Sequence, residues 1–162
     1  MSFYQSTLGL LFLSVSCMAW GGGNHAGGHH HHDGASIGEV GMPEQVSRTV
    51  VVTMADTMRF SPARIQVQAG ETLEIVVRNT GKVKHEMVLG TASDLKAHAA
   101  LMKQHPGMEH ADDNMLTLAP GAEGRLLWRF SQAGKVQFAC LQPGHYEAGM
   151  KGVVHVKPLK AS

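Results

Sequence analysis

Apolar and polar residues alternate over most of the chain after Arg48, with a period of two. This period is typical of half-buried β-strands, whose successive side chains point to opposite faces. The alternating stretches are TVVVTM, ARIQVQ, TLEIVVR, RLLWRF, KVQFAC and GVVHVK. Short strands of this kind predict an all-β sandwich of two sheets around an apolar interior. The side chains expected to face that interior are Val50, Val52, Met54, Ile65, Val67, Leu73, Ile75, Val77, Leu126, Trp128, Phe130, Val136, Phe138 and Cys140.

A different pattern occupies the segment after Gly90. Thr91 and Asp94 stand three residues apart, as in a capping box, and good helix formers follow until Pro106. A threonine followed three residues later by an acidic residue is a helix-start signal, and proline is a stop signal. The sequence therefore predicts one helical insertion, at about residues 92–105.

Composition limits the class of protein. The chain has 162 residues, enough for one domain with a modest tail, and a formal net charge of +1. It has no run of Lys or Arg that would form a binding surface for nucleic acid. The chain has eleven His and ten Met but only two Cys. This excess of imidazole and thioether groups indicates metal chemistry, copper in particular.

Residues 1–19 have the features of a secretory signal peptide. LGLLFLSVSCMA is an apolar run too short to span a bilayer as a helix, and cleavage is expected after Ala19. The first basic residue is Arg48, so only the α-amino group supplies positive charge before the run. A lipid anchor on Cys17 is the alternative, although Ser14 occupies a position where leucine is usual. The mature protein is then expected to have no membrane span.

Residues 20–46 are rich in Gly and His. Such a segment cannot bury enough apolar surface to offset the entropy lost on ordering, so we expect a disordered, flexible N-terminal arm. Two interpretations of its histidines stay open, namely weak metal binding and a solvated linker or expression tag. The candidate donors are His25, His29, His30, His31 and His32. Residues 47–162 are the predicted folded domain.

FACLQPGHYEAGM, from Phe138 to Met150, places a cysteine, a histidine and a methionine at intervals of five residues. Thiolate and thioether are soft donors and imidazole is intermediate, which suits a metal that alternates between Cu(I) and Cu(II). The strand pattern points Cys140 into the sandwich. In the mature chain this thiol has no disulfide partner, and metal ligation would protect it in an oxidising compartment.

One more nitrogen donor would complete a site of the blue-copper kind. His85 is the candidate, because it follows the turn-like NTGKVK and begins the strand-like HEMVLG. Taken alone, such a histidine is more often structural than ligating. Together with Cys140, His145 and Met150, it becomes the expected fourth ligand.

These stretches define a resemblance. MRFSPARIQVQAGETLEIVVRNTGKVKHEMVLG and FACLQPGHYEAGM are similar to parts of cupredoxins, and the likeness covers about residues 47–158. The His-Glu-Met stretch, the helical Met/His insertion and the Cys-x4-His-x4-Met loop together most resemble bacterial periplasmic copper-tolerance cupredoxins of the CopI type. The resemblance implies a cupredoxin-like Greek-key β-sandwich with one mononuclear type 1 copper site. The implied ligands are His85, Cys140 and His145 in equatorial positions and Met150 in the axial position.

The same resemblance implies a periplasmic, monomeric metal-binding protein rather than an enzyme, with weak oxidation of Cu(I) left open. Its expected partners are copper ions and a periplasmic redox protein, copper exporter or oxidase. In two respects the chain departs from the family. The spacing from Cys140 to His145 differs from that of plastocyanin, and the residue after the first ligand histidine differs in type. Many cupredoxins carry Asn or Ser after the first ligand histidine, where it helps to tie the two ligand loops, whereas this chain has Glu86.

Other classes of site fit these residues less well. A structural zinc site would use more Cys or His and no Met. The nucleophile of a thiol protease is not expected at the inner end of a strand with a methionine at ligand spacing. A binuclear copper centre needs a second Cys on the loop, and multicopper oxidases and nitrite reductases need further His ligands and domains.

The helical insertion and the residues after it hold further donors. In the simpler interpretation the helix packs on the sandwich through Leu95 and Met102, with His98 at the rim. The alternative is a second copper site that prefers Cu(I), because thioether-rich loops bind Cu(I). Met also fills gaps in cores, however. The candidate ligands are His98, Met102, His105, Met108, His110 and Met115.

Two functions stay open for the type 1 site. The protein is either a copper-tolerance factor that sequesters, oxidises or passes on periplasmic copper, or a soluble electron carrier to a cytochrome or reductase. The excess of His and Met favours tolerance, because a carrier needs only one copper.

Overall fold

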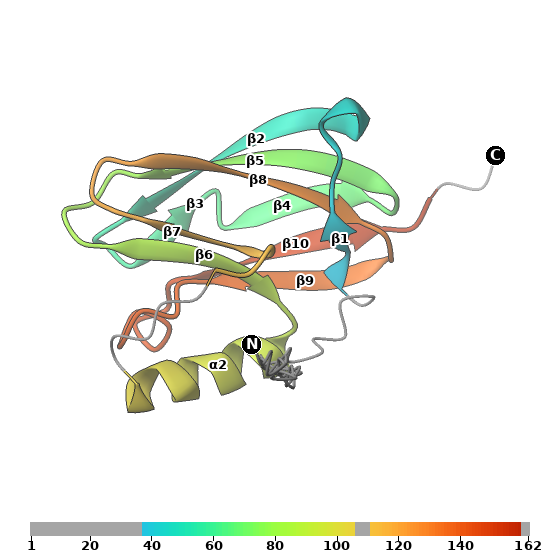
Figure 1. Cartoon of the computed structure of the whole chain (residues 1–162). Helices are drawn as coiled ribbons and strands as arrows, with labels where there is room; N and C mark the ends of the chain where they lie inside the picture. Colours follow the sequence, from blue (N-terminus) through green and yellow to red (C-terminus); the bar gives the residue numbers. More distant parts are fainter. Residues whose placement is uncertain (1–36, 106–110, 160–162) are drawn as a thin grey trace, which may run out of the picture. The chain divides into compact units, whose positions relative to one another are not determined.

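The computed structural model describes residues 37–105 and 111–159, which form two five-stranded sheets with an α-helix beside them (Figure 1). The strands are β1 (Glu39–Val40), β2 (Val46–Ala55), β3 (Arg59–Ser61), β4 (Arg64–Gln68), β5 (Glu71–Asn79), β6 (His85–Gly90), β7 (Met115–Leu118), β8 (Glu123–Phe130), β9 (Gly134–Ala139) and β10 (Lys151–Lys157). A 3-10 helix, η1 (Pro43–Gln45), precedes β2, and the α-helix α2 (Ala92–Gln104) follows β6. Outside the described residues lie the predicted signal segment with Cys17, most of the predicted arm, and the candidate donors His25, His29, His30, His31, His32, Met108 and His110.

The first sheet has the strand order β1-β8-β5-β2-β3 and the second the order β4-β10-β9-β6-β7. Neighbouring strands are antiparallel, except for the parallel pairs β2 with β5 and β4 with β10. The chain passes back and forth between the two sheets, as it does in Greek-key sandwiches. The predicted all-β sandwich is therefore confirmed.

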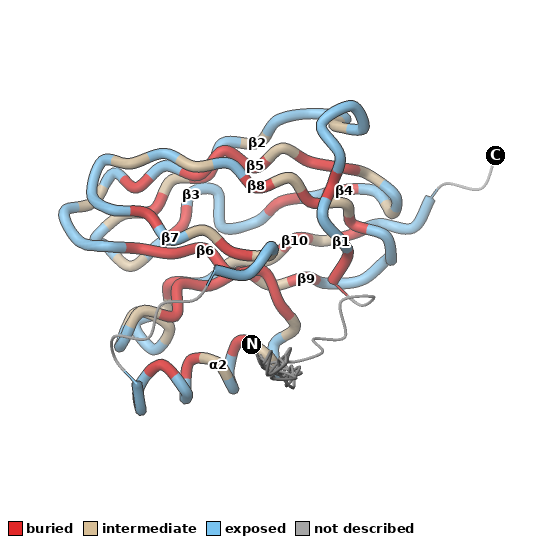
Figure 2. The backbone as a smooth tube through the Cα atoms, viewed as in Figure 1, coloured by how far each residue is buried: buried red, intermediate tan, exposed pale blue. Residues whose placement is uncertain are grey.

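The alternating side chains form the core between the sheets. Leu73, Ile75 and Val77 on β5 are completely buried, while Glu74 and Arg78 face outward and pair with side chains of β8. Figure 2 shows a similar alternation of buried and less buried positions along β8. Every interior side chain expected from the pattern is buried apart from Val50, which is half-buried in the middle of β2.

The fold begins before residue 47, which corrects the predicted boundary of the arm. Ile37 is buried in the core, and its carbonyl oxygen accepts a hydrogen bond from Trp128 Nε1 at 2.8 Å. Strand β1 pairs with β8, and Gly41 lies so close to Thr72 that a Cβ atom there would stand 2.5 Å from its methyl group. A two-residue strand shows no alternation, so the hydrophobic pattern could not reveal it.

Helix α2 confirms the predicted insertion. Thr91 Oγ1 accepts a hydrogen bond from the Asp94 backbone N–H at 3.2 Å, and an Asp94 carboxylate oxygen accepts one from the Thr91 N–H. This capping box satisfies two backbone donors that the first turn would leave without a partner. Within the described residues, no helix is long and apolar enough to cross a membrane.

The buried side of α2 covers the outer face of the second sheet, away from the main core. Leu95, Ala99 and Met102 are buried there. They form a separate apolar cluster with Val88, Met115, Ala139 and Leu141. Met115 begins β7, a four-residue strand that the hydrophobic pattern does not predict.

Candidate metal centre

Two of the predicted donors, His85 and Cys140, lie at the ends of neighbouring strands of the second sheet. His85 is the first residue of β6, and Cys140 directly follows β9. Ala139 pairs with Val88 on one side and with Lys151 on the other. This register brings the start of β6, the end of β9 and the start of β10 to the same end of the sandwich.

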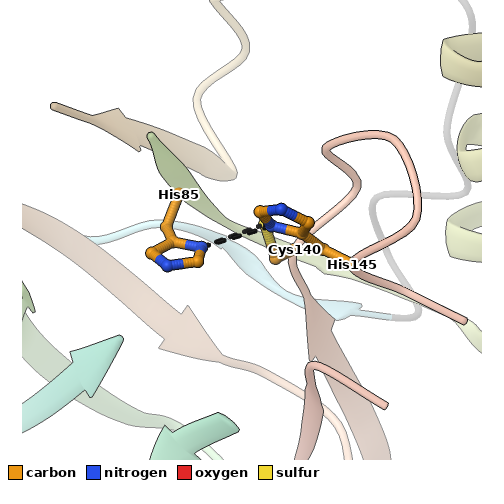
Figure 3. A group of neighbouring side chains, drawn as sticks. All are labelled: His85, Cys140 and His145. Atoms are coloured by element: carbon orange, nitrogen blue, oxygen red, sulfur yellow. Dashed lines mark hydrogen bonds between the residues drawn. The ribbon is translucent and has the colours of Figure 1, made fainter. Parts of the chain in front are cut away.

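His85, Cys140 and His145 bring their ligand atoms within 4.8 Å of one another. The Nδ1 atoms of the two histidines are 3.2 Å apart, and Cys140 Sγ lies 3.2 Å from His145 Nδ1 and 4.0 Å from His85 Nδ1. Figure 3 shows the two imidazole rings and the cysteine side chain directed toward one small space. His85 and Cys140 are completely buried, whereas His145 is half-buried.

Hydrogen bonds within residues 140–150 shape the loop that carries the other donors. The His145 N–H donates to the Gln142 carbonyl oxygen at 2.9 Å, which forms a turn. The Met150 N–H donates to the His145 carbonyl at 3.0 Å, and the Cys140 N–H donates to the Met150 carbonyl at 3.0 Å. The loop thus closes on itself, with Met150 completely buried beside the donors that it is predicted to accompany.

Glu86 connects this loop to β6. Its buried carboxylate accepts hydrogen bonds from the Leu141 N–H at 2.8 Å and from Gln142 Nε2 at 3.0 Å. The Glu86 backbone N–H points to Cys140 Sγ at 3.4 Å. The residue that departs from the usual Asn or Ser therefore still ties the two ligand loops together, with a carboxylate in place of an amide or hydroxyl group.

The environment of the site disfavours charge on its protein groups. Burial raises the pKa of the Cys140 thiol to about 12, although N–H groups of Glu86 and Gln142 oppose this rise. Burial, followed by the charge of His85, lowers the pKa of His145. A neutral imidazole is the form that binds a metal, and a bound cation would compensate the buried thiolate.

The donor geometry fits a single thiophilic cation. Metal–nitrogen bonds of about 2.0 Å and metal–sulfur bonds of about 2.3 Å require two nitrogens to lie no more than about 4.0 Å apart, and a nitrogen and a sulfur no more than about 4.3 Å. The three measured separations, from 3.2 to 4.0 Å, meet this requirement. Two imidazoles and one thiolate form the trigonal set that is typical of blue-copper sites.

Two contacts at this site were not expected from the sequence. His85 Nε2 lies 3.1 Å from Asp56 Oδ1, in the turn between β2 and β3. At the start of β3, directly after this turn, Arg59 Nη1 donates to the Ala148 carbonyl oxygen at 2.9 Å in the cysteine loop. A lone aspartate in a turn carries no sequence signal for such a contact, because only the tertiary fold brings it to His85.

The other candidate donors do not form a comparable group. In the described part of the chain, His85, Cys140 and His145 are the one cluster of three or more His, Cys, Asp or Glu side chains with ligand atoms this close. Met102 and Met115 are buried among apolar side chains of the α2 cluster. His98 is half-buried and His105 is exposed at the end of α2. This placement favours the packing role of the two methionines, and the second copper site stays a prediction.

Comparison with known proteins agrees with this centre. A model of the plastocyanin/azurin family of copper-binding proteins matches residues 46–157. The chain therefore belongs to that family, and the expected copper cofactor is confirmed.

Individual similar proteins indicate which members of the family the chain resembles. The copper-resistant cuproprotein CopI of Rubrivivax gelatinosus is 51% identical over 120 residues, which cover 74% of this chain and 73% of the relative. A protein of the same name from Pseudomonas aeruginosa is 34% identical over 154 residues, covering 77% of this chain and 84% of that protein. The structure of auracyanin B superposes with a TM-score of 0.61 at 26% identity, over 75% of this chain and 97% of that one. The resemblance to cupredoxins of the CopI type is thus confirmed.

Proposed function

We propose that this protein binds one copper ion through His85, Cys140, His145 and Met150 and contributes to copper tolerance in the bacterial periplasm. The observation that carries the proposal is the convergence of two imidazole nitrogens and one buried sulfur at separations of 3.2 to 4.0 Å. Met150 is supported as the fourth donor by its burial and by the backbone bonds that join it to His145 and Cys140.

Copper supplies a one-electron change between Cu(I) and Cu(II). The chain holds the donors in one arrangement for both states. Cys140 is held by the Glu86 and Met150 backbones, and His85 begins a strand that is hydrogen-bonded on both sides. Donors fixed in this way need little rearrangement when the charge of the metal changes, which favours fast electron exchange.

The role in tolerance is supported by the names of two similar proteins, both called copper-resistant, and by donors beyond the four ligands. The apolar run before Ala19 supports export to the periplasm. Electron transfer is the second candidate function. It is favoured by the half-exposed His145, since an imidazole edge near the surface gives a partner access to the metal.

Growth across a copper series separates the two functions. A strain without this protein should grow normally at low copper and fail at elevated copper. The wild-type gene and a control variant at an exposed position, Val51→Ser, should restore growth, whereas Cys140→Ser should not. Unchanged tolerance, including in a background without copper efflux, would overturn the tolerance role. A respiratory or photosynthetic defect at ordinary copper would instead favour the electron carrier.

A further inference from the structure

The turn between β2 and β3 places a carboxylate against the ring nitrogen of His85 that faces away from the donor cluster. His85 Nδ1 faces Cys140 and His145, while its Nε2 lies 3.1 Å from Asp56 Oδ1. The His85 side chain is completely buried, and that of Asp56 is 38% exposed. Resting on the proposed copper site, we propose that Asp56 is a positioning residue that holds the Nε2 proton of His85, directs Nδ1 to copper and favours Cu(II) over Cu(I).

One hydrogen bond to Asp56 and two hydrogen bonds of the neighbouring turn support this position. The Lys82 N–H donates to Asp56 Oδ2 at 2.8 Å, which leaves Oδ1 for the histidine. The Thr80 backbone N–H and hydroxyl both donate to the Met54 carbonyl, at 2.9 and 3.0 Å. They fix the turn between β5 and β6 against the end of β2. The pKa of the Asp56 carboxyl lies below its ordinary value, chiefly because of the Lys82 N–H. The carboxylate is therefore held by its own hydrogen bonds before it meets the ring.

Gly81 completes this arrangement. A Cβ atom at position 81 would lie 2.0 Å from Asp56 Oδ1 and 2.8 Å from its carboxyl carbon. The carboxylate can approach His85 as it does only because residue 81 has no side chain. Gly81 thus provides a second way to move Asp56 without changing its charge.

The physical effect on the metal follows from the charge of the carboxylate. A hydrogen bond from an imidazole N–H to a carboxylate fixes the tautomer and strengthens the other nitrogen as a donor. Both the stronger donor and the nearby negative charge stabilise the more highly charged Cu(II). Changes to such partners of metal ligands alter affinity by about 10- to 100-fold. Since Asp56 is partly exposed and screened by solvent, we expect the lower end of this range.

The reduction potential of the copper-loaded protein tests the proposal. Asp56→Asn removes the charge and keeps one acceptor oxygen, which can serve His85 Nε2 when the new NH2 group faces the Lys82 N–H. It should fold and keep the visible thiolate-to-copper band of the loaded protein. Its preference for Cu(II) over Cu(I) should fall about tenfold, which raises the potential by about 59 mV. Asp56→Ala, which also removes the hydrogen bond, should raise it further. Glu39→Gln removes an exposed carboxylate that pairs with Arg129, outside the ligand loops, and should leave the potential unchanged.

A double-variant cycle distinguishes positioning from a general loss of charge. Gly81→Ala alone should raise the potential, because the new methyl group displaces the carboxylate from His85. In the Asp56→Ala background the same change should have no further effect. A second readout is the His85 Nε2 proton, observed by NMR in the Cu(I)-loaded protein. It should exchange slowly with water in the wild type and faster in Asp56→Ala.

An unchanged potential in Asp56→Asn and Gly81→Ala, with the visible band intact, would overturn this inference and leave the proposed copper site standing. An additive effect of Gly81→Ala in the Asp56→Ala background would also overturn it. Failure of the copper site itself would appear differently, as a visible band that persists in Cys140→Ser.

Discussion

Within the described residues, histidine and methionine are concentrated in two regions, and the structure uses them differently. In the first region, His85, Cys140 and His145 converge on one space at the end of the sandwich. In the second, Met102 and Met115 are buried in the apolar cluster under α2, while His98 lies at its rim. Both regions have the donor types that bind copper, so composition alone does not distinguish them.

The difference lies in the backbone that carries the donors. In the first region they lie at the start of β6 and after β9, where the register of the second sheet brings separate segments together. Those segments are then held by the Glu86 carboxylate, which accepts from the Leu141 N–H, by the Asp56 contact with His85 and by the hydrogen bond that Arg59 donates. On α2, side chains three and four residues apart share a face, and that face covers an apolar sheet surface. A buried thioether there packs against apolar side chains rather than beside other metal donors.

The largest effect, on the visible spectrum, should follow a change at Cys140, where the donors of the first region converge. Cu(II) added to the folded wild-type protein should produce an intense visible band from thiolate-to-copper charge transfer. Cys140→Ser should abolish it completely, because an alcohol cannot replace the thiolate in this transition. Met115→Leu, a change in the second region, should keep the band at full intensity. A coloured Cys140→Ser protein would show that the convergence seen at His85 is not the copper site.

The second region should respond through stability. Met102→Ala should reduce the free energy of unfolding of the metal-free protein by about 2–4 kcal/mol, since it leaves a cavity beneath α2. Met102→Leu conserves volume and should cost less than about 1.5 kcal/mol. Urea unfolding measures both values. The number of Cu(I) ions bound should be the same in Met102→Leu and the wild type. A lower number at unchanged stability would instead support a second copper site and remove the contrast between the regions.

The contrast between the regions also explains what could be predicted from the sequence. The strands with long alternation, the helix with its capping box and the loop with Cys140 each carry a local signal, and all were predicted. His85 was assigned because the loop required another donor. Strands β1 and β7 have two and four residues, too few for a period, so neither was predicted and the arm was extended too far.

The contacts that support the site were harder to foresee. Asp56 lies in a turn that is distant in sequence from His85, and only the fold brings the two together. The role of Gly81 likewise depends on a close approach between two loops. Glu86 was noted as a departure from the family, but its bonds to Leu141 and Gln142 depend on how the cysteine loop folds back. Such partners are fixed by tertiary geometry rather than by any local pattern.

A smaller loss of stability is expected from breaking the tie between the two ligand loops. Glu86→Ala leaves the Leu141 N–H buried without its acceptor, which should cost about 1–3 kcal/mol in the metal-free protein. Glu86→Gln retains an acceptor oxygen and should cost less. Thermal unfolding of the metal-free proteins compares them, with Glu147→Ala on the exposed side of the same loop as control. Equal stability of Glu86→Ala and the wild type would show that the tie does not hold the loops.

The smallest change in the copper site should come from its fourth donor. Met150→Gln should keep copper and the visible band, because the two histidines and the cysteine still converge without residue 150. An amide oxygen is a harder donor than a thioether, so it should favour Cu(II), lower the reduction potential and shift the band. Visible spectra and potentials of Met150→Gln measure this, and Met42→Gln, at an exposed methionine before η1, serves as the control. Identical spectra and potentials in Met150→Gln and the wild type would remove Met150 from the ligand set. Loss of copper from a folded variant would show that this residue holds the metal rather than tuning it.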